Sequence, residues 1–260
     1  MTASTPGALL RQPPGDRYEL DRRLWGFGGV LGGLSLALLT TAMAEQAPAA
    51  SPRGVTARFH RPITGEFSVS ASVVRAGRSV STIAGRCVSG SDVNVEATAI
   101  FTSVRPGSFP VLAPESPAAP KPADCEVYPV SDDVPVVKFV EIRPIDENRP
   151  LAGGPTPELT AWVRLTEDDD PPDVPRLVFL FDVLPPAFYS MVVRRYLIPT
   201  VELSVDLGGG LGTAVSPWVL LRARSRAMDN AGVLNEQVDA WGEDGTYLGT
   251  AHQLRLAREP

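Results

Sequence analysis

Asp182 is the residue whose type and position most suggest chemistry in this sequence. It lies at the edge of an apolar stripe that repeats at helical spacing and is formed by Val174, Leu177, Val178, Phe181 and Leu184. A carboxylate against a buried stripe is costly unless it is paired or used. Two interpretations therefore stay open: Asp182 caps a neighbouring element or faces water, or it serves as a general base.

The segment around Asp182 predicts an interrupted helix followed by a strand. Asp173 stands where an N-cap residue would, and we expect the helix to extend over residues 174–195. Pro185 and Pro186 require that helix to kink or restart. The strand is expected over residues 200–207.

Gln253 is a second candidate, on a strand expected over residues 246–255. Its face of that strand also carries Gly249 and Ala251, and such small neighbours leave space on that face. The alternative is a glutamine on an ordinary exposed strand face. His252 points to the opposite face, so we interpret it as structural.

Thr200 is a third candidate, at the start of strand 200–207. Val201 and the alternate residues after it form the apolar face, so Thr200 has the opposite parity. Its hydroxyl reaches the apolar side only if the strand starts with a bend, which Pro199 would favour.

The remaining composition excludes several other chemistries. Two histidines and two cysteines, Cys87 and Cys125, are too few for a histidine metal centre, a zinc site or a disulfide framework. A G-x-S-x-G nucleophile motif is absent from the sequence. The acidic run 167–170 predicts a solvated lead-in to a helix, with a metal site as the alternative. We expect no metal and no cofactor, and both cysteines reduced.

Length and charge limit the class of protein. With 260 residues, the chain can form one large domain or two small ones. The net charge of −6 argues against a nucleic-acid partner.

The uncharged run 24–44 has three interpretations. It fits an export signal or a marginal membrane span, but acidic residues precede it and it contains the glycine pairs Gly28-Gly29 and Gly32-Gly33. Those features favour a buried helix, as does a counterpart in the second half. We expect no membrane span and a cytoplasmic location.

The order of elements repeats around a proline-rich segment. A helix over 24–46 is followed by strands over 55–60, 66–76, 78–88 and 93–102, and the helix over 174–195 is followed by strands over 200–207, 218–226, 232–241 and 246–255. Further strands are expected over 17–24, 134–145 and 160–165, and a turn over 239–245. The predicted divisions are a flexible N-terminus (1–16), a first half (17–102), a solvated linker (103–130) and a second half (131–260).

Four stretches, in order along the chain, carry a family likeness: WGFGGVLGGLSLAL at 25–38, the segments 56–62 and 74–82, the segments 161–165 and 180–187, and the closing hairpin 241–255. Together they resemble the acyl-CoA thioesterase II family and its thioesterase-like relatives. The resemblance implies an α+β double hotdog, with two curved antiparallel sheets, each wrapped round a central helix.

The resemblance also implies a site and an activity. In that family an Asp, a Thr and a Gln hold the attacking water, and the matching residues are Asp182, Thr200 and Gln253. A buried Asp acquires a raised pKa useful for a general base, while Thr and Gln orient water. Gly28 and Gly29 are expected to supply oxyanion amides. The expected reaction is hydrolysis of fatty acyl-CoA to fatty acid and CoA.

Several expectations on partners and alternatives follow from the same likeness. We expect homo-oligomers. Five arginines are candidates for binding the CoA phosphates, and the alternative is that they form a solvated face: Arg194, Arg195, Arg222, Arg224 and Arg226. A non-catalytic acyl-CoA or lipid binder is the main alternative. A hotdog dehydratase or hydratase ranks last, because His60 and His252 are poorly placed for it.

Overall fold

The computed structural model describes residues 5–103, 107 and 109–259. Alternating apolar and polar residues make strands the main elements of the fold. The strands are β1 (Arg17–Tyr18), β2 (Ser51–Phe59), β3 (Phe67–Arg75), β4 (Val80–Ser89), β5 (Asp92–Thr102), β6 (Val140–Pro144), β7 (Glu158–Leu165), β8 (Thr200–Leu207), β9 (Val219–Met228), β10 (Val233–Gly242) and β11 (Tyr247–Leu256). Within the described residues they form one sheet in the order β1-β3-β4-β5-β2-β8-β11-β10-β9-β7-β6. Every ladder between neighbours is antiparallel.

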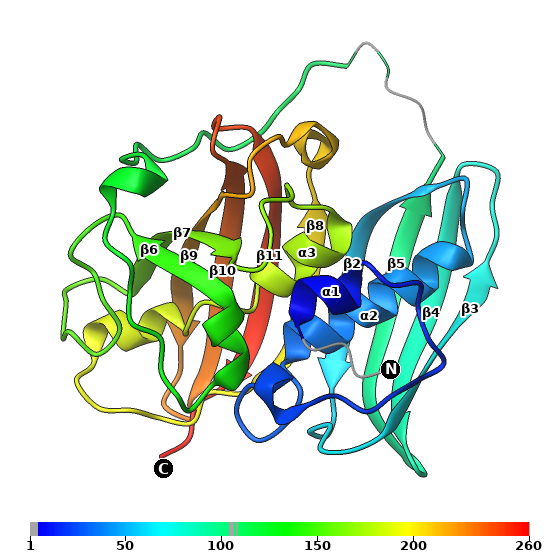
Figure 1. Ribbon diagram of the computed structural model, residues 1–260, viewed down its shortest axis with the longest axis horizontal. Coiled ribbons are helices and arrows are strands. Elements are labelled where there is room, and N and C mark those ends of the chain that lie inside the picture. Colours follow the sequence, from blue (N-terminus) through cyan, green and yellow to red (C-terminus); the bar gives the residue numbers. More distant parts are fainter. Residues whose placement is uncertain (1–4, 104–106, 108, 260) are drawn as a thin grey trace.

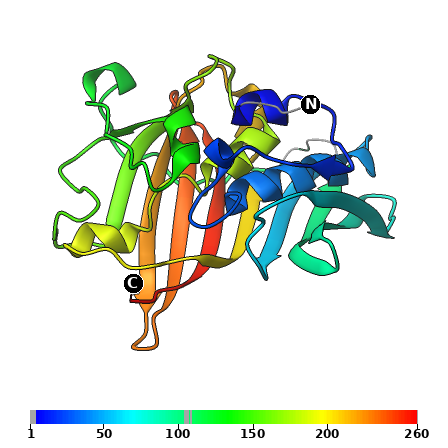
Figure 2. The same cartoon turned by 60° about the horizontal axis from the view of Figure 1, so that its bottom comes forward.

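The helices lie on one side of this sheet (Figure 2). They are α1 (Pro6–Leu10), α2 (Gly32–Glu45) and α3 (Val174–Leu180), with 3-10 turns η1 (Arg22–Leu24), η2 (Pro122–Asp124), η3 (Pro135–Phe139), η4 (Ala187–Met191) and η5 (Gly209–Thr213). α2 is buried almost all round, as expected of a helix that is apolar on every face. It packs on β2 to β5 and on α3 (Figure 1).

The two halves join through β2 and β8. These strands pair from Gly54 opposite Asp206 to Arg58 opposite Glu202, and the Thr56 and Ser204 hydroxyls lie 2.9 Å apart across the ladder. The sheet is therefore continuous across the midline.

The helices differ from their predicted lengths. α3 ends at Leu180, not at 195, because Pro185 and Pro186 prevent its continuation and the chain restarts as η4. α3 packs chiefly on α2. The run 24–44 is helical only from Gly32, since a glycine-rich turn precedes it. Within the described residues no helix has the length and apolar character to cross a bilayer.

Three other predicted elements also need correction. The expected strand 17–24 is strand only at β1 and then becomes η1, while the strand expected over 134–145 begins with η3 and is extended only at β6. The predicted turn 239–245 is shorter, because β10 continues to Gly242. The strand predicted over 200–207 is confirmed as β8.

The predicted linker 103–130 is solvated only in part; residues 104–106 and 108 lie outside the described residues. Phe109 and Leu112 are about nine-tenths exposed. Further along, the Pro120 carbonyl accepts a hydrogen bond from Trp162 Nε1 at 2.9 Å, and the Pro114 carbonyl accepts one from Trp241 Nε1 at 3.0 Å. Two indole N–H groups therefore fasten this stretch to the second half.

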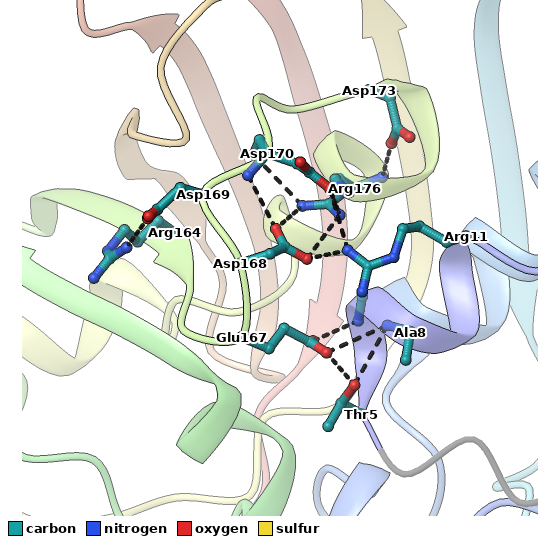
Figure 3. A network of polar contacts seen from close by, with 11 residues as sticks. Thr5, Ala8, Arg11, Arg164, Glu167, Asp168, Asp169, Asp170, Asp173 and Arg176 are labelled. Carbon is teal, nitrogen blue, oxygen red and sulfur yellow. Dashed lines mark hydrogen bonds and ion pairs between the residues drawn. The ribbon is translucent and has the colours of Figure 1, made fainter.

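The acidic loop holds α1 in place, although the N-terminus was expected to be flexible. Residues 1–4 lie outside the described residues, but Thr5 caps α1, and Leu9 and Leu10 of that helix are buried. The Gly7 N–H donates to Glu167 Oε1 at 2.6 Å, and the Thr5 hydroxyl also contacts Glu167 (Figure 3). The loop leads into α3 as predicted but is solvated only in part: Asp169 and Asp170 are exposed, whereas Glu167 and Asp168 are half-buried.

The same loop also forms ion pairs with Arg176 in the first turn of α3. Arg176, only 3% exposed, donates to Asp168 at 2.6 and 3.0 Å and to Asp170 at 3.1 Å, and Arg11 of the C-cap of α1 contacts Asp168 as well (Figure 3). The hydrogen bond from Arg176 holds the pKa of Asp168 well below its usual range. This network fixes the start of α3.

We predict that Asp168→Asn lowers the free energy of unfolding by about 2 kcal/mol at neutral pH, the scale of a hydrogen bond to a charged group. Asp169→Asn, in the same loop but with a side chain 83% exposed, should cost less than about 1 kcal/mol. Because the pKa of Asp168 is depressed on folding, its contribution is present above about pH 4 and is lost as the pH falls further. Urea unfolding from pH 7 to pH 3 should therefore show the gap between wild type and Asp168→Asn closing below pH 4. A gap that widened there would contradict the assignment.

Candidate active site

Asp182 follows directly on the end of α3. Asp173 caps the start of that helix by accepting from the Arg176 N–H at 2.9 Å, as predicted. Phe181 is the C-cap residue, so Asp182 stands just beyond the helix and not within it. It is 9% exposed, and its carboxylate points to α2.

The Asp182 carboxylate caps α2 from the other half of the chain. The N-cap residue of α2 is Leu31, whose side chain cannot accept a hydrogen bond, and the Gly33 N–H in its first turn donates to Asp182 Oδ2 at 2.8 Å. A helix N-terminus favours a negative charge and has N–H groups that need partners. One of the two interpretations left open by the sequence, a capping role, is thereby observed.

The pair Gly32-Gly33 allows this approach. A Cβ on Gly33 would lie 2.6 Å from Asp182 Cβ and 3.1 Å from the Phe179 carbonyl oxygen, and one on Gly32 would lie 3.2 Å from Asp182 Oδ2. A side chain at Gly33 would therefore collide with Asp182, just beyond the end of α3.

Opposing effects set the protonation of Asp182. Burial raises its pKa above the ordinary value, whereas the charge of Arg255 and the N–H of Gly33 act to lower it. Arg255 Nη2 lies 3.8 Å from Asp182 Oδ1, beyond hydrogen-bond distance. Oδ2 is engaged by α2, which leaves Oδ1 as the oxygen to accept a proton.

Gln253 and Thr200 are linked to the backbone next to Asp182. Gln253 is 2% exposed, and its Nε2 donates to the carbonyl of Phe181, the residue before Asp182, at 3.1 Å. The Thr200 hydroxyl donates to Gln253 Oε1 at 3.0 Å. The structure therefore brings together all three residues that the likeness selected.

A β-bulge explains how Thr200 reaches Gln253. β8 pairs Leu203 with Gln253 and Glu202 with Leu254, but Arg255 pairs with Thr200. The extra residue in β8 reverses the parity of Thr200, which places it on the face of Leu203 and Gln253. This irregularity supplies the bend that the sequence analysis required.

Gly28 and Gly29 occupy a turn ahead of α2, not its first turn. The Gly26 N–H donates to the Gly29 carbonyl at 2.8 Å, and Gly28 has a φ of 75° with open space where a Cβ would stand. The amide that meets the carboxylate is that of Gly33. Donation from Gly28 and Gly29 to an oxyanion stays a prediction.

The sequence analysis missed two charged members of the site, Arg255 and Glu236. Both are buried, 6% and 3% exposed, and Arg255 Nε lies 2.9 Å from Glu236 Oε2. Glu236 lies opposite Gln253 in the β10–β11 register, and its Oε1 accepts from the Ala187 N–H at 2.8 Å. The signal was available: Arg255 continues the inward face that carries Ala251 and Gln253 at a spacing of two.

The other candidate residues lie away from this cluster. His252 is exposed on the opposite face of β11, and His60 pairs with Glu96 at 3.4 Å with a side chain 43% exposed. Cys87 and Cys125 are buried free thiols, and burial raises the pKa of Cys87 to about 12. In the part of the chain that the structure describes, no three acidic, Cys or His side chains are grouped to hold a metal ion.

Most of the predicted phosphate-binding arginines are engaged with carboxylates. Arg194 pairs with Glu259 at 3.0 Å, and Arg195 contacts Asp133. Arg222 and Arg224 lie 3.9 and 2.7 Å from Asp239, and Arg226 is exposed. Their role toward CoA stays a prediction.

Two family models match most of the chain. The acyl-CoA thioesterase N-terminal domain matches residues 22–102, and the acyl-CoA thioesterase C-terminal domain matches residues 115–257. The chain belongs to the acyl-CoA thioesterase family. A search among curated proteins finds no match.

Solved structures show the fold. A protein of unknown function with a hot dog fold from Alicyclobacillus acidocaldarius is 24% identical, with a TM-score of 0.84 over 95% of this chain and 94% of that one. The TesB protein of Mycobacterium avium subspecies paratuberculosis is 20% identical (TM-score 0.77, 97% of each chain). The acyl-CoA thioesterase II TesB2 of Mycobacterium marinum is 17% identical (TM-score 0.71, 88% and 89%). The protein is an α+β chain with the hotdog fold.

We predict that Gly33→Ala destabilises the protein by about 1–3 kcal/mol, the usual scale of overpacking. Alanine at a helical position normally stabilises a protein relative to glycine. A loss of stability in Gly33→Ala would therefore be due to the collision with Asp182. Gly65→Ala is the matched control, because a Cβ there meets open space, and it should change stability by less than about 0.5 kcal/mol. Chemical unfolding of both variants measures the difference; a stabilised Gly33→Ala would contradict the packing described.

Proposed function

We propose that this protein hydrolyses fatty acyl-CoA to free fatty acid and CoA, with Asp182 as the general base. The observation that carries the proposal is a buried carboxylate with a raised pKa next to Gln253 and Thr200, in a chain of the acyl-CoA thioesterase family. A base whose pKa is raised toward the working pH is the more effective one.

The proposed reaction needs one proton to be moved twice. Asp182 Oδ1 takes a proton from water while the water oxygen attacks the thioester carbonyl carbon. The resulting oxyanion is stabilised by backbone N–H groups, for which Gly28 and Gly29 are the predicted donors. When the carbon–sulfur bond breaks, the CoA sulfur leaves as a thiolate and takes up the proton that Asp182 holds.

Gln253 and Thr200 are proposed to place the water. Gln253 is fixed at both ends of its amide, by Phe181 and by Thr200, so its orientation is set before substrate binds. The Thr200 hydroxyl donates to Gln253 and keeps its oxygen lone pairs to accept a hydrogen bond from water.

A non-catalytic acyl-CoA or lipid binder remains the second candidate, and one observation favours it. Asp182 caps α2, which accounts for a buried acid without any catalysis. The dehydratase or hydratase alternative has less support, because His60 and His252 are both away from Asp182 on exposed positions.

The finer organisation is also proposed. We expect two pseudo-symmetric hotdog halves, residues 17–102 and 131–260, joined by 103–130, with α2 and the α3–η4 segment as the central helices. We further expect a cytoplasmic enzyme of fatty acid metabolism that assembles into homo-oligomers.

We predict that Asp182→Asn lowers turnover of acyl-CoA by about 10²- to 10⁴-fold, typical of the loss of a general base. Asparagine keeps an oxygen for the Gly33 N–H, so the cap and substrate binding should persist. Thiol release from acyl-CoAs of graded length, with binding measured by calorimetry, separates the candidates. Wild-type turnover in Asp182→Asn would refute the base, and wild-type binding without thiol release would establish the binder.

We predict a smaller loss for the residues that place the water. Thr200→Val removes the hydroxyl that orients Gln253 and should lower kcat by up to about 10²-fold, the scale of a misplaced reacting group, whereas Thr200→Ser keeps the hydroxyl and should stay close to wild type. Gln253→Ala should cost less than Asp182→Asn, since water can replace the amide. Equal activity in Thr200→Val and Thr200→Ser would show that Thr200 does not act through its hydroxyl.

A further inference from the structure

The site contains two buried carboxylates and one guanidinium between them. Asp182, Glu236 and Arg255 are 9%, 3% and 6% exposed, and they come from the end of α3, from β10 and from β11. A buried ionised carboxylate needs a partner. One arginine cannot pair equally well with two acids, so its distances to the two carboxylates have to be compared.

Arg255 lies closer to Glu236 than to Asp182, in an ion contact that lacks hydrogen-bond geometry. Its Nε lies 2.9 Å from Glu236 Oε2, whereas its Nη2 lies 3.8 Å from Asp182 Oδ1. Glu236 is held in turn by the Ala187 N–H at the start of η4. On the other side, the backbone of Arg255 pairs with Thr200 across the bulge in β8. Both ends of the pair are thus anchored to the elements that form the site.

We propose that Glu236 holds the Arg255 guanidinium away from the Asp182 carboxylate, and that this buried pair sets how basic Asp182 is. Without Glu236, the guanidinium is free to close the gap to Oδ1 and form a direct ion pair there. A carboxylate in such a pair is a weak base. Glu236 and Arg255 are positioning residues, and the inference rests on the proposed role of Asp182.

The surroundings contain few other charges. α2 presents the Gly33 N–H to Asp182, and its one ionisable residue, Glu45, is at the opposite end of the helix. β8 contributes Thr200, and η4 contributes Tyr189, whose pKa is raised by burial and which loses its proton only at alkaline pH. Burial raises the pKa of Glu236, while Arg255 and the Ala187 N–H lower it. Asp182 and Glu236 are therefore the titratable groups of this cluster, and the Arg255 guanidinium is the fixed positive charge between them.

The test is the acidic limb of the pH profile of kcat/KM, which reports the base of the free enzyme. Glu236→Gln keeps an acceptor for the Ala187 N–H but removes the charge that holds Arg255. We expect the limb to move to lower pH by about one unit, the scale of a new ion pair, and the plateau rate to fall several-fold. Arg255→Met leaves two carboxylates facing each other, so the limb should move to higher pH by about one unit. Arg255→Lys keeps the charge and should lie between wild type and Arg255→Met.

A matched control is Arg143→Met, which breaks another partly buried arginine–glutamate pair of the second half, with Glu141 at 2.5 Å. It should leave the limb in place. Opposite shifts in Glu236→Gln and Arg255→Met are not expected from a general loss of packing. An unmoved limb, or shifts in the same direction, overturns the inference; if Arg255→Met does not fold, the downward shift in Glu236→Gln decides.

A second readout separates this inference from the proposed function. The Asp182 carboxyl carbon can be followed by NMR in ¹³C-aspartate-labelled protein, with Asp182→Asn assigning the signal. We expect its pKa to increase in the order Glu236→Gln, wild type, Arg255→Met. If wild type releases no thiol, the proposed function fails, and the order of these pKa values still supports or overturns the role of the pair.

Discussion

The contact between the Asp182 carboxylate and the first turn of α2 is the constraint on which the rest of this structure depends. An apolar helix buried all round brings unpaired N–H groups into the interior, and its own N-cap residue is a leucine. The missing acceptor comes from 149 residues away in the sequence. That arrangement demands glycine at 33, leaves little space for a side chain at 32, and goes with a short α3 that ends just before Asp182 and with prolines that stop the chain from continuing as helix.

The sheet supplies the other residues of the site. β2 and β8 join the halves, and β11, next to β8, presents Gln253 and Arg255 towards the end of α3. A single bulge in β8 turns Thr200 to the same face. Of the two carboxylate oxygens of Asp182, Oδ2 accepts the hydrogen bond from the Gly33 N–H, and Oδ1 is the one proposed to take a proton. In the proposed mechanism a structural cap and a chemical base share one side chain, and burial, which makes the cap costly, also raises the pKa that a base requires.

Local patterns predicted what depends on local physics. The alternation along residues 200–207, the N-cap at Asp173 and the small residues beside Gln253 were readable because a strand or a first helical turn is fixed by its own neighbours. The helix expected over 174–195 was wrong in length. The apolar pattern continues past Pro185 and Pro186, whereas α3 ends before them. The N-terminus was expected to be flexible, but α1 is held by Glu167, a partner about 160 residues away that no local pattern identifies. For the same reason, Gly33 and Glu236 could not be assigned to the site from the sequence, although Arg255 continues the face of Gln253. The roles of Asp182, Thr200 and Gln253 came from the family likeness, and the structure adds their proximity.

The most direct test of this account is the position of an intact substrate. The Asp182→Asn variant, crystallised with an acyl-CoA that it cannot turn over, should hold the thioester carbon beside the side chain at 182, with a water in contact with that side chain, Gln253 and Thr200. The acyl chain should then lie along the face of β11 that carries Gly249 and Ala251. A thioester bound elsewhere on the molecule, with the side chain at 182 engaged only by α2, would show that Asp182 is a helix cap and that the chemistry lies in another place.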